Sequence, residues 1–328
     1  GNYHGTSSEY ITVLEGIREE AGDDVRILYS QGCDLYKDKV ENLAWDQDRI
    51  SEAVITAENS DVVILCVGLD ETLEGEEGDT GNSDASGDKV DLHLPKVQEE
   101  LIEKVTAVGK PTIVVLMAGS AIDLNYAQDN CNGILLAWYP GARGGRAVAD
   151  LLFGKESPSG KLPVTFYKDL EGMPEFTDYS MKNRTYRYME KEALYPFGYG
   201  LTYSDTCVTE AEVVGEVSAE SDIMLKATVK NNGTVDTDEV VQVYIKDLDS
   251  PLAVRNYSLC GFKRVSLKAG EEKSVEFTIS NKAMNIVDED GNRYIAGKHF
   301  RLFAGVSQPD TRSAELTGHK PAEVEIAL

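Results

Sequence analysis

The sequence has little positive charge for its size. Only 32 Lys and Arg stand against 57 Asp and Glu among 328 residues, so the formal net charge is −25. Nucleic acids and anionic membrane surfaces bind proteins largely through Lys and Arg, and both would repel this chain. No apolar run approaches the ~20 residues that a membrane-spanning helix needs. We therefore expect neither nucleic acid nor membrane as a partner.

Cysteine and histidine are too few and too scattered to predict a metal centre. The five cysteines are never spaced as Cys-x-x-Cys, which argues against a zinc site and a disulfide framework. None of the four histidines has the His-Glu-x-x-His spacing of a zinc helix. We expect no metal and no cofactor, and a reducing, cytoplasmic location is favoured slightly over secretion. The chain begins with Gly1, so the sequence does not show whether a signal peptide precedes it.

The first two hundred residues contain buried-strand patterns that alternate with helical ones. Strands are predicted over residues 62–68, 112–119 and 133–139, and a helix over 94–108 separates the first two. Further predicted elements are helices over 9–22, 48–60 and 144–154 and a strand over 25–30. This order predicts an α/β fold with at least four mostly parallel strands between layers of helices.

From about residue 205 the pattern changes to short segments in which apolar and polar residues alternate. The predicted strands cover residues 223–231, 239–247, 259–267 and 273–280. Asn232-Gly233 and residues 288–291 have the Asn and Gly typical of hairpin turns. This pattern predicts an antiparallel sandwich of the immunoglobulin or fibronectin type III kind. Residues 157–203 are richer in Pro, Gly and Tyr, and we interpret them as an irregular linker.

An acidic loop follows the first strong strand. Between residues 70 and 88 the sequence has eight carboxylates and no basic residue: Asp70, Glu71, Glu74, Glu76, Glu77, Asp79, Asp84 and Asp88. In open α/β sheets, ligands bind at the carboxyl ends of the strands, where this loop lies. Like-charged neighbours raise the pKa of a carboxyl group, and a general acid near neutral pH requires a raised pKa. The loop is therefore a candidate catalytic loop, and a merely solvated acidic loop is the alternative.

Other chemistries fit this loop less well. Asn82-x-Asp84-x-Ser86-Gly87 matches the first half of a calcium-binding EF-hand loop, but His93 stands where a bidentate Glu is needed. A nucleotide site is set aside because carboxylates would lie where phosphates bind. The sequence has no Gly-x-Ser-x-Gly motif and no partnered Cys and His, so acyl transfer has no visible nucleophile.

Four segments together resemble the C-terminal half of glycoside hydrolase family 3, the β-glucosidases and β-xylosidases: residues 61–79, 91–124, 137–166 and 195–204. The motifs Trp-Tyr-Pro-Gly, Pro-Ser-Gly-Lys-Leu-Pro and Tyr-Pro-Phe-Gly-Tyr-Gly-Leu are specific as a set. The resemblance implies an α/β sandwich domain over residues 1–203, with its first strand missing. It also implies a fibronectin type III-like domain over residues 204–328.

The resemblance implies a retaining β-glycosidase that acts on non-reducing terminal β-linked glucose or xylose. In the family, the nucleophile is an Asp on an N-terminal (β/α)8 barrel, which would be the partner of this chain. We therefore expect the chain alone to be inactive. The family's acid/base is usually a Glu on the loop after the strand that residues 62–67 resemble. The candidates, in order, are Glu76, Glu77 and Glu74.

Three further residues are candidates for substrate binding. Trp138 and Tyr139 end a predicted strand and could stack on a sugar ring, with packing at a domain interface as the alternative. Arg184 could reach the crevice, or it could help to pin the linker. The alternative function for the whole chain is a catalytically inactive carbohydrate-binding or calcium-binding interaction module. The sequence leaves a homodimer open.

Overall fold

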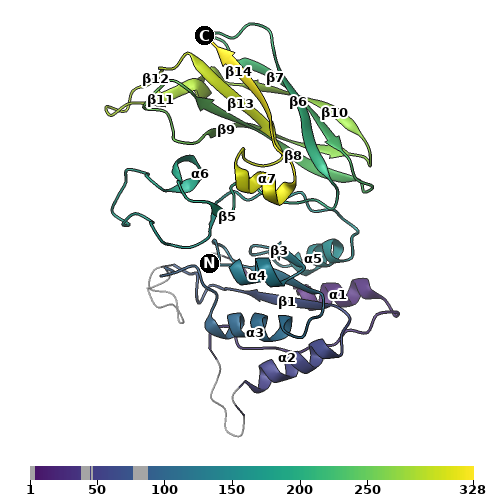
Figure 1. Ribbon diagram of the computed structural model, residues 1–328. Helices are drawn as coiled ribbons and strands as arrows, with labels where there is room; N and C mark the ends of the chain where they lie inside the picture. Colours follow the sequence, from purple (N-terminus) through teal and green to yellow (C-terminus); the bar gives the residue numbers. More distant parts are fainter. Residues whose placement is uncertain (1–3, 38–44, 46, 77–87) are drawn as a thin grey trace. The chain divides into compact units, whose positions relative to one another are not determined.

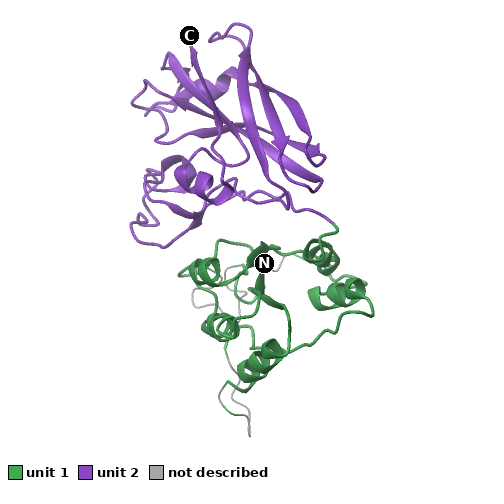
Figure 2. Ribbon diagram, turned by 45° about the vertical axis from the view of Figure 1, so that its right-hand side comes forward, with its two compact units in different colours: residues 1–155 green, residues 156–328 purple. Residues whose placement is uncertain are grey.

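The structure is a computed structural model that describes residues 4–37, 45, 47–76 and 88–328. The chain divides into two compact units, residues 1–155 and residues 156–328 (Figure 1, Figure 2). In the described part of the chain, no helix is both long and apolar enough to cross a bilayer.

The first unit is built on a parallel sheet with the strand order β1-β2-β3. Its elements are α1 (Val13–Ala21), α2 (Asp48–Glu58), β1 (Val63–Gly68), α3 (Lys96–Thr106), β2 (Thr112–Met117), α4 (Asn125–Asn130), β3 (Gly133–Leu136) and α5 (Gly144–Leu152). Val63 lies opposite Thr112, and Ile113 lies opposite Gly133. Because all three strands run the same way, the loops that follow them leave the sheet at one edge.

Helices cover both faces of this sheet (Figure 1). On one face, Val13 of α1 and Val148 of α5 are buried against Val115 of β2. The two helices approach so closely that a Cβ on Gly16 would lie 2.1 Å from the carbonyl oxygen of Gly145. On the other face, α3 contacts both β1 and α2. The predicted α/β class is confirmed for this unit.

The strand predicted over residues 25–30 is wrong. The backbone there has no regular secondary structure, and the sheet has three described strands where at least four were expected. Val25, Leu28 and Tyr29 are 50%, 36% and 60% exposed, so within the described part of the chain these side chains are not buried under a neighbouring layer. Apolar composition alone does not make a strand when there is no partner strand and no covered face.

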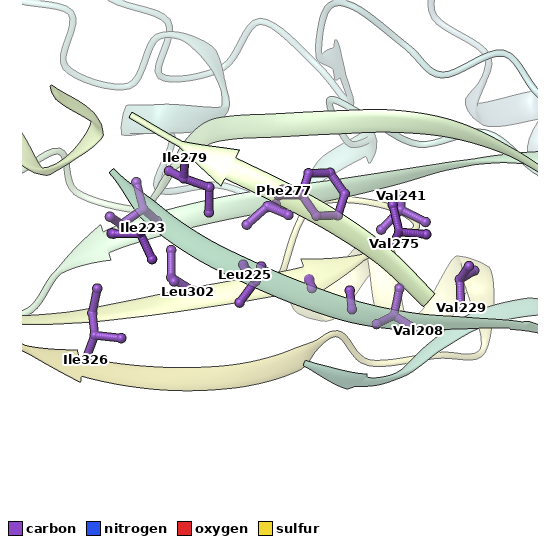
Figure 3. Packing of buried hydrophobic residues seen from close by; sticks show 14 of the residues in the cluster. Val208, Ile223, Leu225, Val229, Val241, Val275, Phe277, Ile279, Leu302 and Ile326 are labelled. Atoms are coloured by element: carbon purple, nitrogen blue, oxygen red, sulfur yellow. The ribbon is translucent and has the colours of Figure 1, made fainter. Parts of the chain in front are cut away.

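The second unit contains a sandwich of two antiparallel sheets with strand orders β10-β7-β6 and β14-β13-β8-β9. Its elements are β4 (Phe166–Tyr167), α6 (Thr185–Tyr188), β5 (Ala193–Tyr195), β6 (Thr206–Val214), β7 (Ile223–Asn231), β8 (Thr237–Asp247), β9 (Ser258–Leu267), β10 (Glu272–Ile279), η1 (Asn281–Met284), β11 (Asn285–Val287), β12 (Arg293–Ile295), β13 (His299–Gly305), α7 (Thr311–Thr317) and β14 (Ala322–Ala327). Alternate residues such as Leu225, Val241 and Phe277 point between the sheets and form the core (Figure 3). The predicted all-β class is confirmed.

One of the two predicted hairpin turns is confirmed and the other is wrong. Residues 288–291 join the paired strands β11 and β12. Asn232-Gly233 instead lies between β7 and β8, which belong to different sheets. The Asn231 side chain explains this corner: its Oδ1 accepts from the Gly233 amide and its Nδ2 donates to the Val235 carbonyl. The turn is real, but it carries the chain from one sheet to the other.

The irregular segment 156–203 belongs to the second compact unit. Lys161 donates to the carbonyl of Gly200 at 2.6 Å and lies 2.8 Å from the carboxylate of Glu239 on β8. Both charged side chains are almost fully buried, at 8% and 2% exposed. The packing boundary thus falls between residues 155 and 156, and a domain boundary at 203/204 stays a prediction.

Candidate active site

The acidic loop begins at Gly68, the last residue of β1, whose backbone is held by Gln98 of α3. The Gly68 amide donates to Gln98 Oε1 at 2.7 Å, and Gln98 Nε2 donates to the Gly68 carbonyl at 2.8 Å. Gly68 has a φ of 153°, and a Cβ there would lie 1.8 Å from the carbonyl oxygen of Met117. Only glycine fits this conformation and this contact with β2. The loop therefore starts from a fixed point.

A tight turn then brings the chain back toward the sheet. The Asp70 carboxylate accepts from the amide and the hydroxyl of Thr72, at 2.9 and 2.7 Å. The Asp70 carbonyl accepts from the amides of Leu73 and Glu74, and the Leu73 side chain is buried. The turn places the side chain of Glu74 at the edge where the strands end.

The Glu74 carboxylate, in the described part of this loop, is held by several donors. Its Oε2 accepts from the Gly119 amide at 2.7 Å and from the Tyr139 hydroxyl at 2.5 Å. Its Oε1 accepts from the Ser120 hydroxyl and lies 3.9 Å from Nζ of Lys89. The side chain is 11% exposed. One carboxylate thus contacts four residues from three other segments of the sequence.

These contacts change how easily the neighbouring groups ionise. Burial opposes the charge on Glu74, but the hydrogen bonds from Ser120, Tyr139 and Gly119, together with Lys89, leave its pKa below the ordinary value. Burial and the adjacent Glu74 carboxylate raise the pKa of Tyr139 well above that of a free phenol. Burial lowers the pKa of Lys89, while Glu74 counteracts that effect. Near neutral pH the group is therefore a carboxylate surrounded by donors.

The structure places the three acid/base candidates differently. Glu74 is held as described, whereas Glu76, two residues further along, is exposed. Glu77 lies outside the described residues, as do Asn82, Asp84, Ser86 and Gly87 of the candidate calcium loop. In the residues that the structure does describe, no group of three or more His, Cys, Asp or Glu side chains could hold a metal ion.

Of the predicted sugar-binding residues, Tyr139 lies at this edge, with its hydroxyl on Glu74 and 40% of its surface exposed. Trp138 precedes it with a φ of 51°, a left-handed conformation that is uncommon for a large side chain. Arg184 belongs to the second unit, where its guanidinium donates to the carbonyls of Glu175 and Pro174 at 2.7 and 3.4 Å. Stacking on a sugar stays a prediction for Trp138 and Tyr139, as does sugar contact for Arg184.

Sequence reasoning missed the partners of Glu74. Lys89 is the first basic residue after the eight carboxylates, and Ser120 follows the glycine at the end of the strand over 112–119. The sequence could have predicted that both residues lie near the acidic loop, because residues that follow parallel strands meet at one edge of the sheet. The sequence does not show which carboxylate they would meet.

Two family models match the chain. The glycosyl hydrolase family 3 C-terminal domain matches residues 1–203, and the fibronectin type III-like domain matches residues 239–308. The chain belongs to glycosyl hydrolase family 3. The resemblance expected from the sequence is thereby confirmed, as is its match to the C-terminal part of these enzymes.

Individual relatives agree with this family. A β-xylosidase of Formosa agariphila is 34% identical over 97% of this chain and 43% of its own length. A xylan 1,4-β-xylosidase of Xylanibacter ruminicola is 40% identical over 81% of this chain and 31% of its own length. The solved structure of a β-glucosidase from Erythrobacter marinus is 30% identical with a TM-score of 0.82, covering 100% of this chain and 44% of that one. The chain therefore spans less than half the length of each of these relatives.

Proposed function

We propose that this chain is the acid/base-bearing part of a retaining β-glycosidase that removes non-reducing terminal β-linked glucose or xylose. The family membership and the xylosidases and glucosidases among its relatives support this activity. The observation that carries the site assignment is the acidic loop at the carboxyl ends of the parallel strands, with Glu76 exposed beside an anchored Glu74. The partner is a (β/α)8 barrel that supplies the nucleophilic Asp.

The proposed reaction has two steps. The barrel carboxylate attacks the anomeric carbon while Glu76 gives its proton to the departing glycosidic oxygen. Glu76, now a carboxylate, then takes a proton from water as that water displaces the nucleophile and releases the sugar. Glu74 is the weaker candidate for this role, because its donors keep it ionised and a general acid must carry a proton.

The test is Glu76→Ala in the enzyme that joins this chain to its barrel. We expect kcat on an aryl β-glucoside or β-xyloside to fall by about 10²- to 10⁴-fold, the usual worth of general acid–base catalysis. Azide should restore part of the rate and give the β-glycosyl azide, since azide needs no base to attack the glycosyl-enzyme. Glu71→Ala, which removes an exposed carboxylate from the same loop, is the matched control.

Two results would count against this proposal. If Glu77→Ala lowers kcat and azide rescues it, while Glu76→Ala has no effect, the acid/base is Glu77 and not Glu76. Sugar binding without hydrolysis in the joined wild-type enzyme would instead favour an inactive carbohydrate-binding protein. The chain without a barrel should hydrolyse no aryl glycoside, because the proposed nucleophile lies on the barrel.

A further inference from the structure

The Glu74 carboxylate links all three strand ends of the sheet. Glu74 itself follows β1, Gly119 and Ser120 follow β2, and Tyr139 follows β3. Gly119, Ser120 and Tyr139 lie 45, 46 and 65 positions from Glu74 in the sequence, so these contacts are tertiary. A proton donor needs freedom to release and regain its proton, whereas both oxygens of Glu74 are already occupied by donors.

We propose that Glu74 is a positioning residue, whose carboxylate, held by Ser120, Tyr139 and the Gly119 amide, fixes the acidic loop so that Glu76 meets the glycosidic oxygen. This inference rests on the proposed function. Glu76 is two residues beyond the anchor, so movement of Glu74 is passed directly to it. Catalysis by a proton donor depends steeply on its distance and direction from the reacting oxygen.

The backbone around the anchor is adapted to it. A Cβ on Gly119 would lie 2.9 Å from the Tyr139 ring and 3.2 Å from Glu74 Oε2, so a larger residue would push these groups apart. Trp138, immediately before Tyr139, has an uncommon left-handed backbone conformation at the same place. Backbone strain of this kind concentrates at functional sites. Among the described residues, Lys89 acts electrostatically on Glu74, Asp70 acts on Tyr139 and Asp91 acts on Lys89, while the donors around Glu74 keep its pKa low.

The experiment uses the joined enzyme and two substrates with different leaving groups. The 2,4-dinitrophenolate leaving group departs without being protonated, because it is a weak base. The 4-methoxyphenolate leaving group is more basic and needs a proton from the general acid. We expect Glu74→Ala to lower kcat/KM on the methoxyphenyl substrate by about 10²-fold, the cost of a misplaced catalytic group, and to affect the dinitrophenyl substrate much less. Azide should not rescue it. Glu74→Gln, which preserves the side-chain size, and Tyr139→Phe, which removes one donor, should show smaller losses with the same substrate dependence.

Glu71→Gln serves as the control, because it removes an exposed charge from the same loop. Equal losses on both substrates would overturn the inference in favour of a purely structural role. Azide rescue of Glu74→Ala with formation of the glycosyl azide would also overturn it, because Glu74 would then be the acid/base. A joined wild-type enzyme without β-glycosidase activity would refute the proposed function itself. An active wild type in which Glu74→Ala behaves like Glu71→Gln would refute only this inference.

Discussion

The energy of the Glu74 carboxylate depends on the hydrogen bonds and the burial around it. Hydrogen bonds to a charged group contribute about 1.5–3 kcal/mol each, and Glu74 accepts three. Part of this gain offsets the loss of water around a carboxylate that is 11% exposed. The pKa of Glu74 is lowered because the hydrogen bonds from its donors lower it by more than burial raises it. Ionised Glu74 therefore stabilises the folded unit as well as the loop.

This balance predicts how stability changes with pH. Because the pKa of Glu74 in the folded protein is below its ordinary value of 4.5, its contribution is present above that value and is lost as the pH falls through the lower folded-state pKa. We expect the difference in Tm between wild type and Glu74→Gln to be largest near neutral pH and to shrink in acid. Thermal unfolding followed by circular dichroism across this range checks it. A difference that stays constant with pH, as expected for lost packing alone, would contradict it.

At the scale of elements, Gln98 is the joint between helix α3 and strand β1. Its side chain is 3% exposed and bonds both backbone groups of Gly68, and its Nε2 also donates to the Leu35 carbonyl at 2.7 Å. An amide is suited to this position because it has both a donor and an acceptor. The helix therefore fixes the strand end from which the acidic loop departs.

We expect Gln98→Leu to destabilise the first unit. The substitution leaves the backbone groups of Gly68 and the Leu35 carbonyl without this partner, at about 1–3 kcal/mol for each buried group left unsatisfied. Urea unfolding should show the lower midpoint. Glu103→Leu, an exposed position on the same helix, is the control and should change stability little. If the two variants unfold at the same urea concentration, Gln98 does not have this role.

The sequence predicted elements best where burial is regular. The alternation over residues 223–231 predicted β7 with its observed bounds, because one face of that strand is buried throughout. The prediction failed over residues 25–30, where apolar side chains remain exposed and none of the described strands pairs with the segment. The loop at the strand ends was predictable from the parallel order. The contacts of Glu74 were not, because its partners are fixed only when three separate strand ends meet.

At the scale of the whole molecule, two of the family motifs hold the second unit together. Pro-Ser-Gly-Lys-Leu-Pro and Tyr-Pro-Phe-Gly-Tyr-Gly-Leu lie side by side: the Leu162 amide donates to the Tyr199 carbonyl and the Gly198 amide to the Leu162 carbonyl. The buried Lys161–Glu239 pair ties them to β8. Tyr186 from the same segment stacks on Phe197 and accepts from the Leu259 amide of β9. The irregular segment thus packs against the sandwich and makes hydrogen bonds and an ion pair with its strands.

This arrangement predicts that the segment and the sandwich unfold together. A fragment of residues 156–328 should melt in one cooperative transition. A fragment of residues 204–328 should be much less stable, because it loses Lys161, the ion-pair partner of Glu239, and the hydrogen bonds between Ser157 and Thr237 and from Gln242 to the Gly198 carbonyl. Thermal and urea unfolding of the two purified fragments make the comparison.

Variants within the longer fragment separate the ion pair from the rest of the segment. Removing one member of a buried pair costs about 3–5 kcal/mol, so Lys161→Met should lower stability by that amount. Lys161→Met combined with Glu239→Leu should recover part of the loss, because no charge is then left buried alone. Lys168→Met, at an exposed ion pair of the same segment, is the matched control and should cost less than about 1 kcal/mol. Equal stability of the two fragments would instead place the domain boundary at 203/204 and leave residues 156–203 as a linker.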